Sequence, residues 1–246
     1  MSATPTACVL IIGNEILSGK TQDANLQYLG TELAKLGIKL VEARVVRDDV
    51  DAIVAHLNEC RAKFSYVFTT GGIGPTHDDI TAESIAKAFG VELIVDEEAL
   101  RRIQRPDREL NEARLKMARI PAGAALIDNP ISKAPGFRME NVYVMAGIPS
   151  IARAMFEAAA DGLRRGKTIH SRAVDVLLRE SDLAEALERI ALAHPEVEIG
   201  SYPFTREGRF GASLVVRGTD EQTVERVLGE IESSMAALEG VAAPQQ

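Results

Sequence analysis

The segment TTGGIGPTHDDIT, residues 69–81, places a glycine-rich turn directly before two adjacent carboxylates, Asp78 and Asp79. Glycine lets backbone N–H groups come close to a phosphate, because no Cβ stands in the way. Two neighbouring carboxylates repel each other unless a cation lies between them, and hard divalent cations prefer such oxygen ligands. These residue types therefore predict a site that holds a phosphate together with a metal ion. The glycines concerned are Gly71, Gly72 and Gly74.

The same segment has a plainer interpretation, in which the glycines only form a tight turn and a polar residue caps the following helix. Thr76, Asp78 and Asp79 are all suitable N-cap residues, and Pro75 stiffens the loop before them. No Gly-Lys-Ser/Thr follows the glycines, which excludes a Walker loop. The residues alone leave both interpretations open.

An alternation of strand-like and helix-like segments must hold this turn in position. Asp48 or Asp49 is suited to cap one of the helices, which is expected to run through Ala62. The rhythm predicts an α/β fold, with a mostly parallel sheet covered by helices on both faces. Ligands of such sheets bind beyond the carboxyl ends of the strands, where the 69–81 segment lies. Apolar and β-branched runs predict the strands at residues 7–12, 38–46, 66–70, 91–95, 124–127 and 142–146.

The stretch DNPISKAPGF, residues 128–137, is interpreted as a loop between the last two of these strands. It carries Lys133, a residue that could clamp a phosphate. An exposed loop lysine is the ordinary alternative.

The pattern changes near the basic stretch RRGKT, residues 164–168, and predicts a boundary between two domains, 1–166 and 167–246. The second region is expected to be a small α+β domain with an antiparallel sheet. Its predicted elements are a strand at 169–178, a helix at 182–193, strands at 197–202 and 210–217, and a helix at 219–238.

Composition argues against several classes of protein. The net charge is -8, no basic cluster stands out, aromatic residues make up 4% and Trp is absent, so we expect no nucleic-acid partner. The N-terminal apolar run is too short for a signal peptide or a membrane span, which favours a cytoplasmic protein with no membrane partner. Cys8 and Cys60 lack metal-binding spacing and are expected to be reduced and half-buried.

The whole segment 69–81 closely resembles the signature of the molybdopterin-binding domain, the family that includes MogA, MoaB, gephyrin and MoeA. The chain is most similar to the branch found at the N-termini of the competence/damage-inducible protein CinA and of eukaryotic FAD synthase. The resemblance covers nearly the whole chain. It is also carried by GNEILSGKTQDANLQYL (13–29), RVVRDD (44–49), NEARLKMARIPAGAALIDN (111–129), APGF (134–137) and EIGSYPF (198–204).

This resemblance implies that a pterin or a nucleotide pyrophosphate binds across the ends of the central strands. It assigns Asp78 and Asp79 to metal-assisted phosphate chemistry and adds Asp23 as a third catalytic carboxylate. It assigns the phosphate subsite to Gly71, Gly72, Gly74, Pro75 and Thr76, and further ligand contacts to Glu15, Asn25, Asn129, Ser132, Pro135 and Gly136. On the residues alone, Asp23 is equally a helix N-cap, Glu15 a solvated turn carboxylate and Asn25 an ordinary first-turn residue.

The leading hypothesis for function is a metal-dependent nucleotide pyrophosphatase acting on ADP-ribose or FAD. The expected metal is Mg²⁺, Mn²⁺ or Co²⁺, with K⁺ as a further candidate, because a bound divalent ion polarises phosphoryl oxygens and activates water. One alternative is a protein of molybdenum cofactor synthesis that binds or adenylylates molybdopterin. Another is a non-catalytic module that senses a dinucleotide. In each case the partner is a small nucleotide or pterin, and the resemblance implies a homo-oligomer, a dimer or a trimer.

Overall fold

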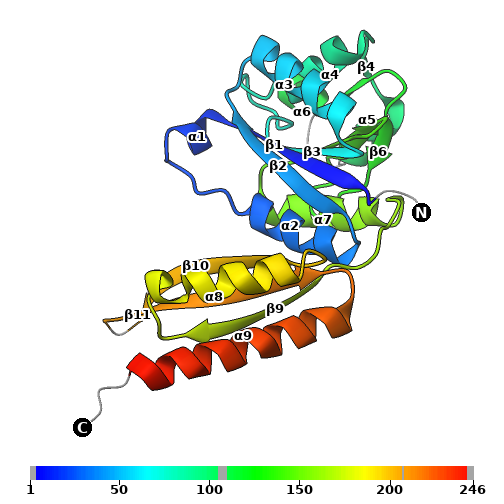
Figure 1. Cartoon of the computed structure of the whole chain (residues 1–246). Helices are drawn as coiled ribbons and strands as arrows, with labels where there is room; N and C mark the ends of the chain where they lie inside the picture. Colours follow the sequence, from blue (N-terminus) through cyan, green and yellow to red (C-terminus); the bar gives the residue numbers. More distant parts are fainter. Residues whose placement is uncertain (1–3, 105–109, 207, 243–246) are drawn as a thin grey trace. The chain divides into compact units, whose positions relative to one another are not determined.

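The computed structural model describes residues 4–104, 110–206 and 208–242. The chain divides into two compact units (Figure 1). The first comprises Met1–Leu33 and Ile38–Gly166, and the second comprises Ala34–Gly37 and Lys167–Gln246. Within the described residues, no helix has the length and apolar character needed to cross a membrane.

The first unit is built on a six-stranded sheet with the order β2-β1-β3-β8-β7-β6. The first four strands of this order are parallel, and β7 and β6 each run antiparallel to their neighbour. A separate two-stranded antiparallel sheet joins β4 and β5. The strands are β1 Thr6–Ile12, β2 Lys39–Val46, β3 Tyr66–Thr70, β4 Leu93–Val95, β5 Arg119–Pro121, β6 Ala125–Ile127, β7 Gly136–Met139 and β8 Val142–Met145.

Helices cover both faces of the six-stranded sheet (Figure 1). On one face, α3 packs Ile53 and Leu57 against Cys8 and Leu10 of β1. On the other, the ring of Phe156 in α7 lies 5.7 Å from that of Phe68 in β3. The helices are α1 Asn14–Leu17, α2 Asn25–Lys35, α3 Val50–Lys63, α4 Thr81–Phe89, α5 Glu97–Ile103, α6 Glu112–Lys116 and α7 Pro149–Ala160. The expected α/β architecture, mostly parallel with helices on both faces, is confirmed.

Strand register brings three loops to one edge of the sheet. Thr70, the last residue of β3, lies beside Ile11 of β1 on one side and Met145 of β8 on the other. Because these strands are parallel, the segments that follow β1, β3 and β8 all leave from the same carboxyl edge. The glycine turn at 71–74 is the middle one of the three.

Two local predictions have clear outcomes. Asp49 is the N-cap of α3, and its side chain accepts a hydrogen bond from the Ala52 N–H at 2.9 Å. The interpretation of 128–137 wholly as a loop is wrong, because β7 begins at Gly136 and pairs with both β6 and β8. Gly136 permits this close pairing, since a Cβ there would lie 2.4 Å from the Val144 carbonyl oxygen.

The cysteines are more deeply placed than expected. Cys8 and Cys60 are both fully buried, with no exposed surface, and both are free thiols. The Cys8 thiol donates to the Cys60 sulfur at 3.4 Å. They are therefore part of the packed core between β1 and α3 rather than half-exposed residues.

The second unit contains a three-stranded antiparallel sheet with the order β10-β11-β9. Two helices pack against it, and its core includes Leu187, Leu214 and Ile231. The small α+β domain expected from the sequence is confirmed. Its elements are β9 His170–Val176, α8 Glu180–Ala193, β10 Glu198–Arg206, β11 Arg209–Gly218 and α9 Glu221–Ala242.

Candidate functional site

The candidate site begins where β3 ends, at Gly71. Its N–H donates to the Met145 carbonyl at 3.1 Å, which ties the turn to the end of β8. Its φ is +104°, and a Cβ at this position would lie only 2.1 Å from the Ile12 carbonyl oxygen of β1. Only glycine allows the ends of β1, β3 and β8 to approach so closely here.

Thr81, the first residue of α4, closes the turn from its other side. Its N–H donates to the Gly72 carbonyl and its hydroxyl to the Gly71 carbonyl, both at 2.9 Å. Gly72 has a φ of +69°, and a Cβ there would lie 2.2 Å from the Thr81 Oγ1. Thr81 is fully buried. Sequence reasoning assigned no role to this residue, although it lies within the 69–81 segment.

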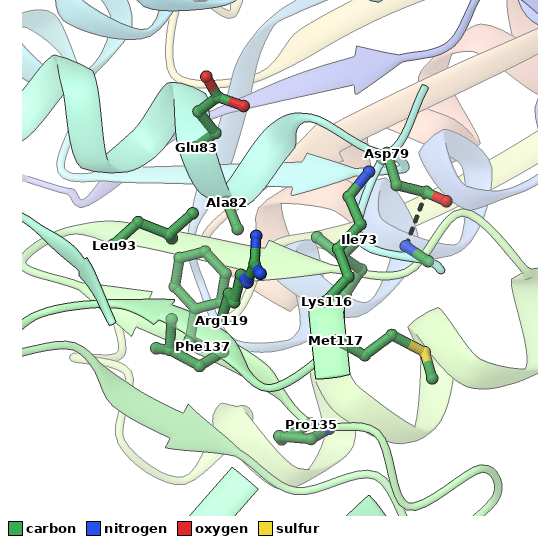
Figure 2. A pocket seen from close by; sticks show the side chains of 13 residues that line it. Ile73, Asp79, Ala82, Glu83, Leu93, Lys116, Met117, Arg119, Pro135 and Phe137 are labelled. Carbon is green, nitrogen blue, oxygen red and sulfur yellow. Dashed lines mark hydrogen bonds between the residues drawn. The ribbon is translucent and has the colours of Figure 1, made fainter. Parts of the chain in front are cut away.

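Asp79 turns back into the loop. Its carboxylate accepts a hydrogen bond from the Gly74 N–H at 2.7 Å (Figure 2). It also accepts one from the Thr76 N–H at 2.8 Å. A Cβ on Gly74 would lie 2.7 Å from this carboxylate, which explains why glycine is needed there. The N-cap of α4 is Ile80, and no side-chain capping hydrogen bond is formed at this end of the helix among the described residues. The interpretation of Thr76, Asp78 or Asp79 as the helix cap is therefore wrong.

The two adjacent carboxylates share one hydroxyl. Thr76 Oγ1 lies 2.5 Å from an oxygen of Asp78 and 2.5 Å from an oxygen of Asp79, yet it has one proton to donate. This hydroxyl, followed by the backbone N–H of Asp78 itself, holds the pKa of the Asp78 carboxyl below its ordinary value. Both carboxylates therefore lie around one hydroxyl at the exposed end of the loop.

The side chains of Asp78, Asp79 and Thr76 can be compared with the ligands that a metal ion requires. No group of three His, Cys, Asp or Glu side chains with metal-binding geometry exists among residues 4–104, 110–206 and 208–242. Asp23 is therefore not gathered with Asp78 and Asp79 into a preformed three-carboxylate centre. Two carboxylates and a hydroxyl do fit an Mg²⁺-type ion, which keeps several waters and commonly shares its ligands with substrate phosphates.

A small hollow lies against the turn, between it and β5 (Figure 2). Its volume is about 70 Å³, and its lining includes four residues from the predicted set, Gly72, Gly74, Asp79 and Pro135. Two cationic residues from a distant part of the chain, Lys116 and Arg119, also line it. Lys116 Nζ donates to the Thr76 carbonyl. The sequence analysis missed both cations.

The other predicted residues of the second loop serve its own structure. Asn129 is buried, its amide donates to the Ser132 hydroxyl and the Ala134 carbonyl, and its oxygen accepts from the N–H groups of Ile131 and Ser132. Gly136 lies within β7, where it permits close strand pairing. Only Pro135 of this group reaches the hollow among the described lining residues.

The residues after β1 occupy the same edge of the sheet in different roles. Asp23 accepts from the Leu26 N–H at 2.8 Å and so stabilises the start of α2. Asn25 is buried and donates to the Gly147 carbonyl at 2.8 Å, while its Oδ1 has no partner within the described part of the chain. The Glu15 carboxylate folds back over Gly13. That Asp23, Asn25 and Glu15 contact a ligand remains a prediction.

Comparison with known proteins gives two family matches. Residues 8–165 match the model of a probable molybdopterin binding domain. Residues 168–242 match the middle domain of FAD synthase.

Individual relatives agree with these matches. A protein of Archaeoglobus fulgidus is 32% identical over 91% of this chain and 95% of its own length. A probable FAD synthase of Caenorhabditis elegans is 30% identical over 96% of this chain and 51% of its own length. Among solved structures, the protein CinA with unknown function from Thermoplasma acidophilum is 34% identical, with a TM-score of 0.61, over 65% of this chain and 98% of that one.

Proposed function

The chain belongs to the molybdopterin-binding domain family, and from that membership we propose that it is a metal-dependent hydrolase of nucleotide pyrophosphates such as ADP-ribose or FAD. The observation that carries the proposal is the arrangement of charges at the 69–81 turn. Two carboxylates share the Thr76 hydroxyl, and Lys116 and Arg119 line the adjoining hollow, to which Asp79 also belongs. Carboxylates suit a metal ion and the cations suit phosphate oxygens.

The hydrogen bonds of the turn define which groups are available to a phosphate. The N–H groups of Gly71 and Gly74 are used within the protein, by Met145 and Asp79 respectively. The Gly72 N–H has no acceptor among the described residues, and Gly72 lines the hollow. We therefore assign backbone binding of a phosphate to Gly72 and its neighbour Ile73 rather than to all three glycines.

Asp79 has a double role in this proposal. Its carboxylate holds the backbone of Gly74 and Thr76, which fixes the loop before any ligand arrives. Together with Asp78 it would hold a divalent ion, and the ion when bound supplies Lewis acidity and an activated water. Preorganised charges lower a barrier because they need no rearrangement during the reaction. Cleavage of the pyrophosphate bond of ADP-ribose with water gives AMP and ribose 5-phosphate.

The test is a substrate and metal panel with the purified chain. ADP-ribose, FAD and NADH are incubated with Mg²⁺, Mn²⁺ or Co²⁺, with and without K⁺, and products are separated chromatographically. The proposal predicts AMP release that requires a divalent ion and stops with a chelator. Absence of AMP with every substrate and metal combination would reject it.

A second candidate is a protein that binds molybdopterin, and the family match over residues 8–165 favours it. In this case the same turn would hold the terminal phosphate of the pterin. Saturable molybdopterin binding without hydrolysis of any dinucleotide would support this function over the first. Tight, metal-independent binding of a dinucleotide without turnover would instead indicate a sensing module.

A further inference from the structure

Two cations that line the hollow beside the turn, Lys116 and Arg119, have few carboxylate partners in the described part of the chain. Lys116 forms no ion pair with a carboxylate within 4.0 Å among the described residues. Arg119 has one, at 3.6 Å to Glu112, whose side chain is 85% exposed. An exposed pair of this kind contributes little energy, so Arg119 can readily exchange it for a better anion.

Both cations are held on ordered elements. Lys116 ends α6, a helix whose N-cap Asn111 accepts from the Arg114 N–H at 3.0 Å. Arg119 begins β5, where it pairs with Val95 of β4. A single hydrogen bond from Lys116 to the Thr76 carbonyl leaves two further donors on its ammonium group. Both residues are thus carried by ordered backbone, and their side chains can still bind an anion.

Two carboxylates, Asp79 and Glu83, also line the hollow, but neither pairs with Lys116 or Arg119 within 4.0 Å in the part of the chain that the structure describes. The Asp79 carboxylate is taken by the loop N–H groups, and in Figure 2 the Glu83 carboxylate points away from the other labelled side chains. Apolar groups, including Ile73 and Phe137, form much of the remaining wall. Apolar walls lower the local dielectric and so strengthen the attraction between a cation and an anion.

The hollow is large enough for a small anion. Its volume of about 70 Å³ is several times the roughly 10–15 Å³ that a cavity needs to hold one water molecule. A phosphate-sized group can therefore be accommodated. The hollow is also contiguous with the carboxylate pair, because Asp79 belongs to both.

We propose that this hollow is an anion subsite in which Lys116 and Arg119 bind one phosphate of a pyrophosphate while the linked phosphate lies at Asp78 and Asp79. This inference rests on the proposed function and adds the reason for a pyrophosphate requirement: the two contiguous positions need two linked phosphates. Nucleoside monophosphates fill one position only and are therefore poor ligands.

Binding of inorganic pyrophosphate tests the subsite directly. Isothermal titration with Mg²⁺ present compares the wild-type chain with Lys116→Ala, Lys116→Arg and Arg119→Ala. Lys87→Ala serves as a matched control, because Lys87 is an exposed lysine of α4 that pairs with Asp51. We expect pyrophosphate to bind about tenfold more weakly to Lys116→Ala and to Arg119→Ala, since each loses a charge-assisted hydrogen bond. Lys87→Ala retains wild-type binding, and Lys116→Arg, which keeps the positive charge, binds pyrophosphate more tightly than Lys116→Ala does.

The result that overturns the subsite is wild-type pyrophosphate affinity in Lys116→Ala. Equal loss in Lys116→Ala and Lys87→Ala also overturns it, because the loss then follows from the net charge of the chain and not from the hollow. In turnover, Lys116→Ala is expected to raise KM more than it lowers kcat.

The subsite and the proposed function fail separately. Pyrophosphate binding that depends on Lys116, without hydrolysis of any nucleotide, retains the subsite and rejects the pyrophosphatase. Hydrolysis of a nucleotide by a chain whose pyrophosphate binding does not depend on Lys116 retains the pyrophosphatase and rejects the subsite.

Discussion

The collision between Gly72 and Thr81 predicts a measurable energetic coupling. Replacing Gly72 by Ala imposes a side chain at a φ of +69° and places its Cβ 2.2 Å from the Thr81 Oγ1. The hydroxyl must then rotate away and lose its 2.9 Å hydrogen bond to the Gly71 carbonyl. Removing the hydroxyl first, with Thr81→Ala, removes the same bond and also removes the collision.

The expected magnitudes follow from these two effects. A left-handed conformation costs a non-glycine residue about 1 kcal/mol. Loss of a buried hydrogen bond that leaves its acceptor unpaired costs about 2 kcal/mol. Gly72→Ala should therefore lower the free energy of unfolding by about 3 kcal/mol, Thr81→Ala by about 2 kcal/mol, and the double variant by only about 3 kcal/mol. The free energy of unfolding of the double variant should thus be about 2 kcal/mol higher than the sum of the two single losses would give.

Urea unfolding followed by far-ultraviolet circular dichroism measures these differences, since the chain has no Trp. Gly90→Ala is the matched control: its φ is +66°, and an added Cβ would meet no atom within 4 Å. The free energy of unfolding of Gly90→Ala should fall only by the cost of the left-handed backbone conformation. If the Gly72 and Thr81 effects add, or if Gly72→Ala costs no more than Gly90→Ala, the described packing of the turn is incorrect.

Two further predictions concern groups outside the site. Cys8 and Cys60 are fully buried, so neither should react with a thiol reagent in the native chain and both should react in denaturant; rapid native reaction would contradict this burial. Burial, and then the charge and hydrogen bond of Glu157, raise the pKa of Tyr28 to about 12, so spectrophotometric titration should show a phenol that ionises late. Tyr28→Phe should abolish that late step. Because the unfolded phenol ionises near pH 10, this group's contribution to stability should be lost as pH rises from 10 to 12, and a uniform titration near pH 10 would refute it.

Most of the parallel core was predictable because β1, β3 and β8 are short runs of almost wholly buried residues. The run 66–70 became β3, and 142–146 became β8 with one residue fewer. β7 was harder to predict, since it has four residues and follows a proline-containing loop. Its stability comes from pairing with β6 and β8, and pairing between distant segments leaves little local signal.

Only the part of the site that lies within one continuous segment was predictable from the sequence. The glycines and carboxylates of segment 69–81 are evident in the sequence, yet the roles of these residues depend on three-dimensional contacts. Asp79 binds the loop rather than capping α4 because its carboxylate folds back onto Gly74. Lys116 contacts Thr76 across 40 positions of sequence, and no local pattern distinguishes it from a solvated helical lysine. Lys133, which the sequence analysis considered as a phosphate clamp, is exposed and lies outside the described lining of the hollow.

The measurement that tests the central claim most directly is divalent-metal-dependent AMP release from ADP-ribose by the wild-type chain and by Asp79→Ala. Asp161→Ala is the control, because the Asp161 side chain is 97% exposed and lies at the end of α7. Circular dichroism must show both variants folded. The account predicts full activity in the wild type and Asp161→Ala and a loss of at least about a hundredfold in Asp79→Ala, the scale on which removal of one electrostatic catalytic group reduces kcat. Unchanged AMP release by a folded Asp79→Ala chain would contradict the assignment of the 69–81 turn as the site of catalysis.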